Sequence, residues 1–245
     1  SATILFGVLL YTVQIWADFS GYTDMGRGAA RACGIKLPEN FKAPYLAVSP
    51  SDFWRRWHIT LSSWIRDYIY IPLGGNRVSL VRNIFIVLFS MGLCGVWHGA
   101  AWTFVLWGFY HGLLVSIQHI CKKIYPNFKI PKIISCVLMF IAIALGWVMF
   151  RSESIQDAIF IYQGLYSISF DGIVLEAFDN SRLVIEAMFL LGIALSMQSL
   201  EERPTIIELY RTKLNPLLRG VGAGVVVCLA IMLRGTSAPF IYFQF

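Results

Sequence analysis

Charged side chains are scarce in this sequence. Asp, Glu, Lys and Arg make up 14% of the 245 residues, whereas hydrophobic residues make up 57%, and the mean hydropathy is +0.65. Soluble domains carry about 25% charged residues, and a chain of this length cannot hide so much apolar surface inside itself. A soluble globular domain, a disordered chain and a collagen-like repeat are excluded. The apolar excess is predicted to face a lipid bilayer.

Cysteine pairs with metal-binding spacing are also missing. The five cysteines form no CxxC pair, so neither a disulfide framework nor a zinc site is indicated. The histidines lack an HExxH pattern, and we expect no metal and no bound cofactor. An initiator Met and a charged region ahead of the first apolar stretch are absent as well, so no signal peptide is visible. The chain is expected to begin partway through a larger protein.

Apolar runs are long enough to cross a membrane several times. Residues 83–121 contain no Asp, Glu, Lys or Arg, and one helix of that length would extend about 58 Å, well beyond the ~30 Å hydrocarbon core of a bilayer. Two passes are therefore predicted, with a break in the small-residue cluster 95–101. The other apolar stretches are 2–17, 133–150, 183–200 and 217–233. About six membrane helices in an all-α polytopic bundle are expected.

Loop charges predict the orientation of these helices. Residues 122–132 carry four lysines and no acid, whereas residues 151–182 carry five acids. By the positive-inside rule the first segment is cytoplasmic and the second external. The basic residues of 201–219 and the arginines of 18–82 place these segments on the cytoplasmic side too.

Residues 18–82 are too aromatic for a solvated loop and too charged for a normal span. Within them, residues 51–68 are predicted to form one amphipathic helix that Ser51 caps. His58 lies between its two faces and can point into the protein interior. Both an interfacial anchor and the wall of a buried site are compatible with this cytoplasmic or re-entrant segment. Its apolar face consists of Trp54, Trp57, Leu61, Trp64, Ile65 and Tyr68.

His98 lies in the middle of the longest uncharged run. Ionisable side chains at membrane depth are costly and usually face a cavity or the bundle interior, and an imidazole is a good general base near neutral pH. His98 is therefore predicted to be functional, with a structural hydrogen bond to a neighbouring helix as the alternative. His111 is predicted to be structural, and His119 is expected at the cytoplasmic interface.

Several stretches resemble the membrane-bound O-acyltransferase family, in the bacterial branch that acetylates alginate. The matching residues are 18–25 (DFSGYTDM), 37–41 (LPENF), 53–62 (FWRRWHITLS), 66–77 (RDYIYIPLGGNR) and 97–102 (WHGAAW). The resemblance implies an enzyme of the bacterial cytoplasmic membrane that passes an acyl group, expected to be acetyl, to a hydroxyl of a cell-surface polysaccharide. The donor is expected to be acetyl-CoA or another cytoplasmic acyl thioester, free or on a carrier protein. Transfer is direct or through an extracytoplasmic acetyltransferase partner.

Residue roles follow from the same resemblance. The family's invariant histidine corresponds to His98, the expected base, and its second signature polar position corresponds to His58, which orients the donor or stabilises the oxyanion. Family members are considerably longer, so residues 1–245 are expected to be the C-terminal part of a single domain that lacks its N-terminal half. This fragment alone is therefore not expected to be fully active. The expected substrate-binding residues are Arg55, Arg56, Trp57, Arg66, Asp67, Asn76 and Trp97, of which the arginines attract donor phosphates.

Two other functions are compatible with buried histidines in a membrane bundle. One is a transporter or channel-like subunit whose histidines relay protons. The other is a non-catalytic membrane scaffold for an extracellular transferase. Membrane lipid is an expected partner in every case, and no nucleic acid is expected.

Overall fold

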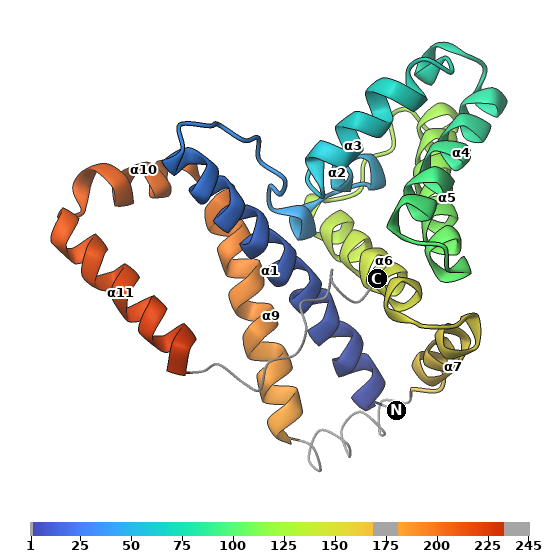
Figure 1. Ribbon diagram of the computed structural model, residues 1–245. Coiled ribbons are helices and arrows are strands. Elements are labelled where there is room, and N and C mark those ends of the chain that lie inside the picture. Colours follow the sequence, from blue (N-terminus) through green and yellow to red (C-terminus); the bar gives the residue numbers. More distant parts are fainter. Residues whose placement is uncertain (1, 169–180, 233–245) are drawn as a thin grey trace.

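The computed structural model describes residues 2–168 and 181–232. Within these ranges the chain is helical and forms no β-strand, so the predicted all-α fold is confirmed (Figure 1). The long helices are α1 (Ala2–Ala32), α4 (Leu80–His98), α5 (Trp102–Ile124), α6 (Lys132–Arg151) and α9 (Ser181–Glu201). The shorter ones are η1 (Pro44–Leu46), α2 (Pro50–Phe53), α3 (Ile59–Ile65), η2 (Arg66–Tyr70), η3 (Gly75–Arg77), α7 (Ile155–Tyr166), α10 (Pro204–Lys213) and α11 (Pro216–Met232).

Among the described residues, five helices are long and apolar enough to cross a bilayer, namely α1, α4, α5, α6 and α9. The chain is thus a multi-pass membrane protein. The expected break in residues 83–121 is confirmed, because α4 ends at His98 and α5 begins at Trp102. The sixth expected span corresponds to α11, whose 17 residues extend about 26 Å.

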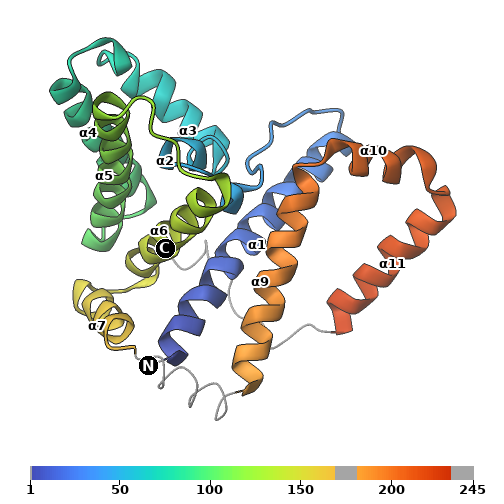
Figure 2. The ribbon, with the colours of Figure 1, turned by 180° about the vertical axis from the view of Figure 1, so that it is seen from behind.

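The long helices form two groups on either side of α6. In Figures 1 and 2, α1 lies beside α9, α4 lies beside α5, and α11 stands on the far side of α9 from the α4–α5 pair. The end of α1, α10 and the start of α4 lie at one end of the molecule and α7 lies at the other. Segments predicted to share the cytoplasmic side thus share one end. Of the acids behind the external prediction, Asp171, Glu176 and Asp179 lie outside the described residues.

Glycines let α4 and α5 pack backbone to backbone. A Cβ atom on Gly95 would overlap the carbonyl group of Phe104, and a Cβ atom on Gly108 would overlap the carbonyl group of Met91. Small residues allow such close approach between membrane helices. This hairpin places His98 at its turn, within the predicted break at 95–101.

The prediction of one helix over 51–68 is wrong. The chain forms α2, turns at His58, whose φ of 44° is left-handed, and then forms α3 and the π-helical η2. The helix cap is Ser49, whose side chain accepts a hydrogen bond from the backbone N–H of Asp52, and not Ser51. Asn40 binds the start of α3, because its carbonyl accepts from the N–H of Ile59 and its side chain from that of Thr60.

This break also divides the predicted apolar face. Trp57, Leu61 and Ile65 are buried, whereas Trp64 and Tyr68 are 52% and 69% exposed. The inward residues join an aromatic core where α2, α5 and α6 meet, and there the Trp57 ring lies 4.9 Å from Trp147. The largest fully buried side chains there include Phe53, Trp57, Trp107, His111, Trp147 and Phe150.

Candidate functional site

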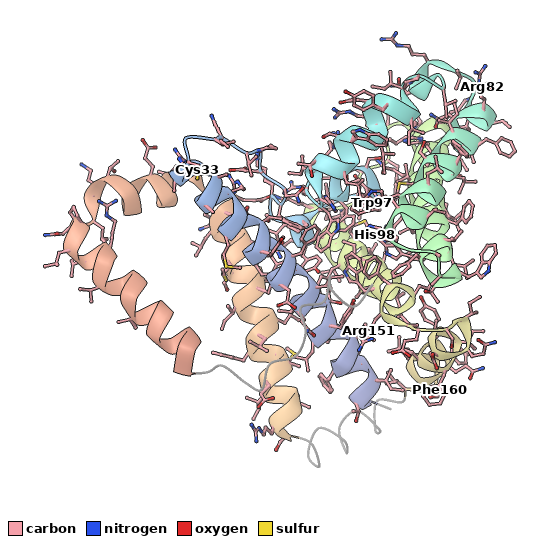
Figure 3. All side chains as sticks on the ribbon, viewed as in Figure 1. Cys33, Arg82, Trp97, His98, Arg151 and Phe160 are labelled. Atoms are coloured by element: carbon pink, nitrogen blue, oxygen red, sulfur yellow. The ribbon has the colours of Figure 1, made fainter. Side chains whose placement is uncertain are left out.

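One indole stands between the two histidines that the motifs single out. The ring centroid of Trp97 lies 5.0 Å from that of His98 and 5.7 Å from that of His58, edge-on in both cases. Trp97 and His98 end α4, while His58 forms the turn between α2 and α3. Figure 3 shows Trp97 and His98 near the centre of the view, between α1 and the α4–α5 pair. Folding therefore unites two sequence motifs that lie 40 residues apart.

His58 is held in an apolar environment. Its side chain is 8% exposed and its ring lies 4.8 Å from that of Phe19 on α1. Burial lowers the pKa of His58 to about 4, because a buried site disfavours the charged imidazolium. Its Nδ1 atom has no hydrogen-bond partner among the described residues. At neutral pH His58 is thus an uncharged ring with an unused polar atom.

His98 is half-buried among aromatic rings. Its centroid lies 5.2 Å from that of Trp107 and 5.1 Å from that of Phe150. Gly99 follows with φ 155°, a conformation that other residues rarely adopt, and a Cβ atom there would crowd the ring of Phe104. The glycine in the Trp-His-Gly sequence therefore lets the chain turn directly behind the imidazole.

A cavity of about 430 Å³ lies between the α2–α3 segment and the α4–α5 pair. Arg55 and Arg66, two of the predicted substrate-binding residues, both line it. Its other lining residues are Ser51, Trp54, Ile59, Ser62, Ser63, Ile65, Tyr70, Val87, Ser90, Met91, Val115 and His119. The lining of the cavity is mostly apolar, and serine hydroxyls, the His119 imidazole and the two arginines form its polar part.

Two tryptophans separate this cavity from His98. Trp54 lines the cavity, its ring centroid lies 5.8 Å from that of Trp107, and Trp107 in turn contacts His98. Neither histidine of the motif pair lines the cavity. In the described conformation the rings of Trp54 and Trp107 therefore link the cavity to the histidine pair, and His98 itself does not reach the cavity.

The other predicted binding residues lie elsewhere. Arg56 forms ion pairs with Asp52 (3.0 Å) and Glu202 (2.6 Å). Although burial opposes its charge, the hydrogen bonds to Glu202 and Asp52 raise the pKa of Arg56. Trp57 is a core residue, 2% exposed. Asn76 is exposed in η3.

Asp67 is engaged by its sequence neighbour. Its two carboxylate oxygens accept hydrogen bonds from Nε and Nη2 of Arg66, at 2.7 and 3.0 Å. These bonds lower the pKa of Asp67 and raise the pKa of Arg66. Both side chains are exposed, so solvent screens the pair. Of the two arginines at the cavity, Arg55 carries the charge that no carboxylate offsets among the described residues.

His111, predicted to be structural, is fully buried, and its ring stacks at 5.8 Å on that of Phe53. Sequence reasoning missed one polar feature near this region. Asn83 is 5% exposed and accepts a hydrogen bond from His119. The only signal for Asn83 was a polar side chain at the start of an apolar run. Across residues 2–168 and 181–232, no three His, Cys, Asp or Glu side chains are grouped to hold a metal ion.

The fold and this geometry define a polytopic helical membrane protein with a histidine pair and a cavity among its helices. The sequence profile of the membrane-bound O-acyltransferase family matches residues 2–155, and the chain belongs to this family. The family resemblance of the motifs is thereby confirmed.

Individual relatives match about two thirds of the chain. The peptidoglycan O-acetyltransferase of Helicobacter pylori is 44% identical over 168 residues, which cover 66% of this chain and 31% of that protein. The Probable alginate O-acetylase AlgI of Pseudomonas aeruginosa is 42% identical over 162 residues, with the same coverage. The teichoic acid D-alanyltransferase of Bacillus subtilis is 32% identical over 158 residues, 58% of this chain and 40% of that protein. The matched residues thus span 31–40% of the length of these relatives.

Proposed function

We propose that this protein carries the histidine site of a membrane O-acyltransferase. It transfers an acyl group, acetyl in our proposal, from a cytoplasmic thioester to a hydroxyl of a cell-surface polysaccharide, directly or through an extracytoplasmic partner. We place it in the cytoplasmic membrane of a bacterium. The observation that carries the proposal is the convergence of His58 and His98 on Trp97 within an aromatic environment.

The proposed chemistry assigns His98 as the general base. Its imidazole takes the proton from the acceptor hydroxyl while the oxygen attacks the thioester carbonyl carbon and forms the C–O bond. The C–S bond then breaks, and the leaving thiolate takes the proton back from His98. Aromatic walls that exclude water protect the thioester from hydrolysis.

His58 is proposed to stabilise the charge that develops on the carbonyl oxygen. Because burial lowers the pKa of His58 to about 4, the ring is neutral at pH 7 and one of its nitrogens carries a hydrogen that it can donate. A donor held in place before the reaction stabilises an oxyanion at little reorganisation cost. This role requires the left-handed backbone turn at His58, which places the ring in the protein interior.

The cavity is proposed to receive the thioester donor. Arg55 supplies uncompensated positive charge at its edge, and Arg66 adds charge that Asp67 partly offsets. Phosphates of coenzyme A or of a carrier-protein arm fit that edge. Arg56, Trp57 and Asn76 do not line the cavity, and we assign the first two to support of the fold.

The test is mass analysis of surface polysaccharide from cells that produce the complete protein or its His98→Ala variant. We expect loss of O-acetyl groups with unchanged protein in the membrane fraction. Tyr125→Ala, in the exposed loop after α5, is the control and should acetylate normally. Full acetylation in both His98→Ala and His58→Ala would contradict the proposal and favour a scaffold. Solute flux without any thioester would favour a transporter.

A further inference from the structure

A chain of hydrogen bonds joins four helical elements beside the cavity. Nδ1 of His119 lies 2.7 Å from Oδ1 of Asn83. Nδ2 of Asn83 lies 2.8 Å from Oη of Tyr70 and 2.7 Å from the carbonyl oxygen of Gly75. The chain thus runs from α5 through α4 to η2 and η3. Because Asn83 is buried, its polar atoms depend on these partners.

The carbonyl of Gly75 fixes the direction of these bonds. A carbonyl oxygen can only accept, so the amide nitrogen of Asn83 must face it and the amide oxygen must face His119. That amide oxygen also only accepts, so Nδ1 of His119 must carry a hydrogen. In a neutral imidazole the other nitrogen, Nε2, then holds a lone pair and is an acceptor.

The ring of His119 belongs to the wall of the cavity. Among the described residues, no protein group forms a hydrogen bond with its Nε2 atom. The same wall presents Arg55, Arg66 and the apolar side chains of Met91 and Val115. The imidazole of His119, two guanidinium groups and an apolar surface therefore line one cavity.

We propose that Nε2 of His119 accepts a hydrogen bond from a ligand that carries an N–H or O–H donor, an alkyl segment and an anionic group. Amide-bearing phosphate esters combine these features. The phosphopantetheine arm of an acyl thioester is the member of this class that the proposed function supplies, so the ligand assignment rests on that function. The tautomer of His119 does not depend on the proposed function, because it follows from the hydrogen bonds of Asn83 alone.

The tautomer can be measured without any catalysis. The protein contains four histidines, and ¹⁵N-histidine labelling distinguishes rings protonated at Nδ1 from rings protonated at Nε2 by their ¹⁵N chemical shifts. The His119 signal is assigned by its loss in His119→Gln. We expect the Nδ1–H form, and the Nε2–H form would overturn the proposal.

Two substitutions of His119 by amide residues distinguish its proposed ligand-binding role from its hydrogen bond to Asn83. In His119→Asn the amide nitrogen occupies the region of Nδ1 and can still donate to Asn83, but the Nε2 acceptor is lost. In His119→Gln the amide oxygen reaches the region of Nε2, but the bond to Asn83 is lost. With coenzyme A as the probe, we expect His119→Asn to bind about five- to tenfold more weakly and His119→Gln to bind within about threefold of the wild type.

The opposite ranking would show that the ring only supports Asn83, and would overturn the proposal. Failure of the wild type to bind coenzyme A would overturn the ligand assignment. If acetylation of the polysaccharide depends on His98 but proceeds with the same kinetics in His119→Asn as in the wild type, this inference is overturned. The proposed function would then still stand.

Discussion

His58 combines an unfavourable backbone conformation with a buried ring. Its backbone adopts a left-handed φ of 44°, which costs free energy for most side chains, and its ring is buried between Phe19 and Trp97. Asparagine tolerates this backbone conformation better than most residues. His58→Asn is therefore the substitution that preserves the turn while removing the imidazole.

We predict that His58→Asn folds but acylates slowly. Loss of one oxyanion donor typically lowers kcat about 10²- to 10³-fold. The measurement is the initial rate of acetyl transfer in membranes with matched protein levels. His58→Gly keeps the turn without any polar side chain and should be at least as slow. A rate within twofold of the wild type in both variants would contradict the oxyanion role.

His58 also predicts a pH dependence of stability. Its pKa is lowered from 6.5 to about 4 on folding, so the unfolded chain binds a proton that the folded chain does not. The free energy of unfolding is therefore highest above pH 6.5. It falls by up to about 3 kcal/mol as the pH drops toward 4, because protonation of this histidine favours the unfolded chain. Thermal unfolding in detergent between pH 4 and 8 should therefore show a decline that is smaller in His58→Asn. Identical pH profiles would contradict this prediction.

Residue identities in the site could be predicted only in part. The motifs singled out His58, His98 and Trp97, but no spacing rule could show that the two histidines meet at one indole. Trp57 stands in the same motif as His58 and yet belongs to the aromatic core, where its ring lies 4.9 Å from that of Trp147. The assignment of catalytic roles stays a prediction.

Among the elements, α9 is attached at its end to the segment that carries His58. The side chain of Gln198 accepts a hydrogen bond from the N–H of Tyr45 at 2.7 Å, and Glu201 accepts one from the N–H of Ala43 at 2.8 Å. Arg56 adds its ion pair with Glu202. These three contacts link residues 43–56 to a helix that lies some 150 positions later in the sequence.

Gln198→Met tests this attachment. The buried N–H of Tyr45 would lose its acceptor, which costs about 1–3 kcal/mol. We expect a lower midpoint of thermal unfolding and reduced acetyl transfer. Met197→Leu, at an exposed position of the same helix turn, is the control and should match the wild type. Equal stability of both variants would contradict the attachment.

The α4–α5 hairpin gives a second prediction for an element. Gly108→Ala would push a Cβ atom into the carbonyl group of Met91, and forced overpacking typically costs about 1–3 kcal/mol. We expect less folded protein after detergent extraction, measured by size-exclusion chromatography. Gly7→Ala, where the new Cβ meets open space, should extract normally.

Helices could be predicted well from hydropathy and poorly from amphipathicity. Long apolar runs specified the spans because lipid leaves the backbone few alternatives to a helix. The segment 51–68 was predicted wrongly because its periodicity is local, whereas Asn40, which accepts the hydrogen bonds at the start of α3, lies outside that segment.

For the whole molecule, the net charge of +6 and the position of Arg55 at the cavity predict electrostatic attraction of an anionic donor. Arg55→Gln should raise KM for acetyl-CoA several-fold with little change in kcat, and the salt dependence of KM should weaken because screening acts on that charge. The readout is donor-dependent acetyl transfer at increasing NaCl. Lys129→Gln, in the exposed loop after α5, is the matched loss of charge, and an equal effect there would assign the attraction to net charge alone.

The contact between Trp54 and Trp107 beside the cavity has a consequence for the proposed use of the donor. Because His98 does not line the cavity and reaches it only through these two rings, a donor in the cavity does not contact the proposed base. Under the proposed function, donor cleavage then waits until the two indoles shift, and an acceptor that triggers the shift would be consumed in step with the donor. A smaller side chain at Trp54 would uncouple the two, so that thioester is spent on water and the ratio of polymer acetylated to donor consumed falls below one.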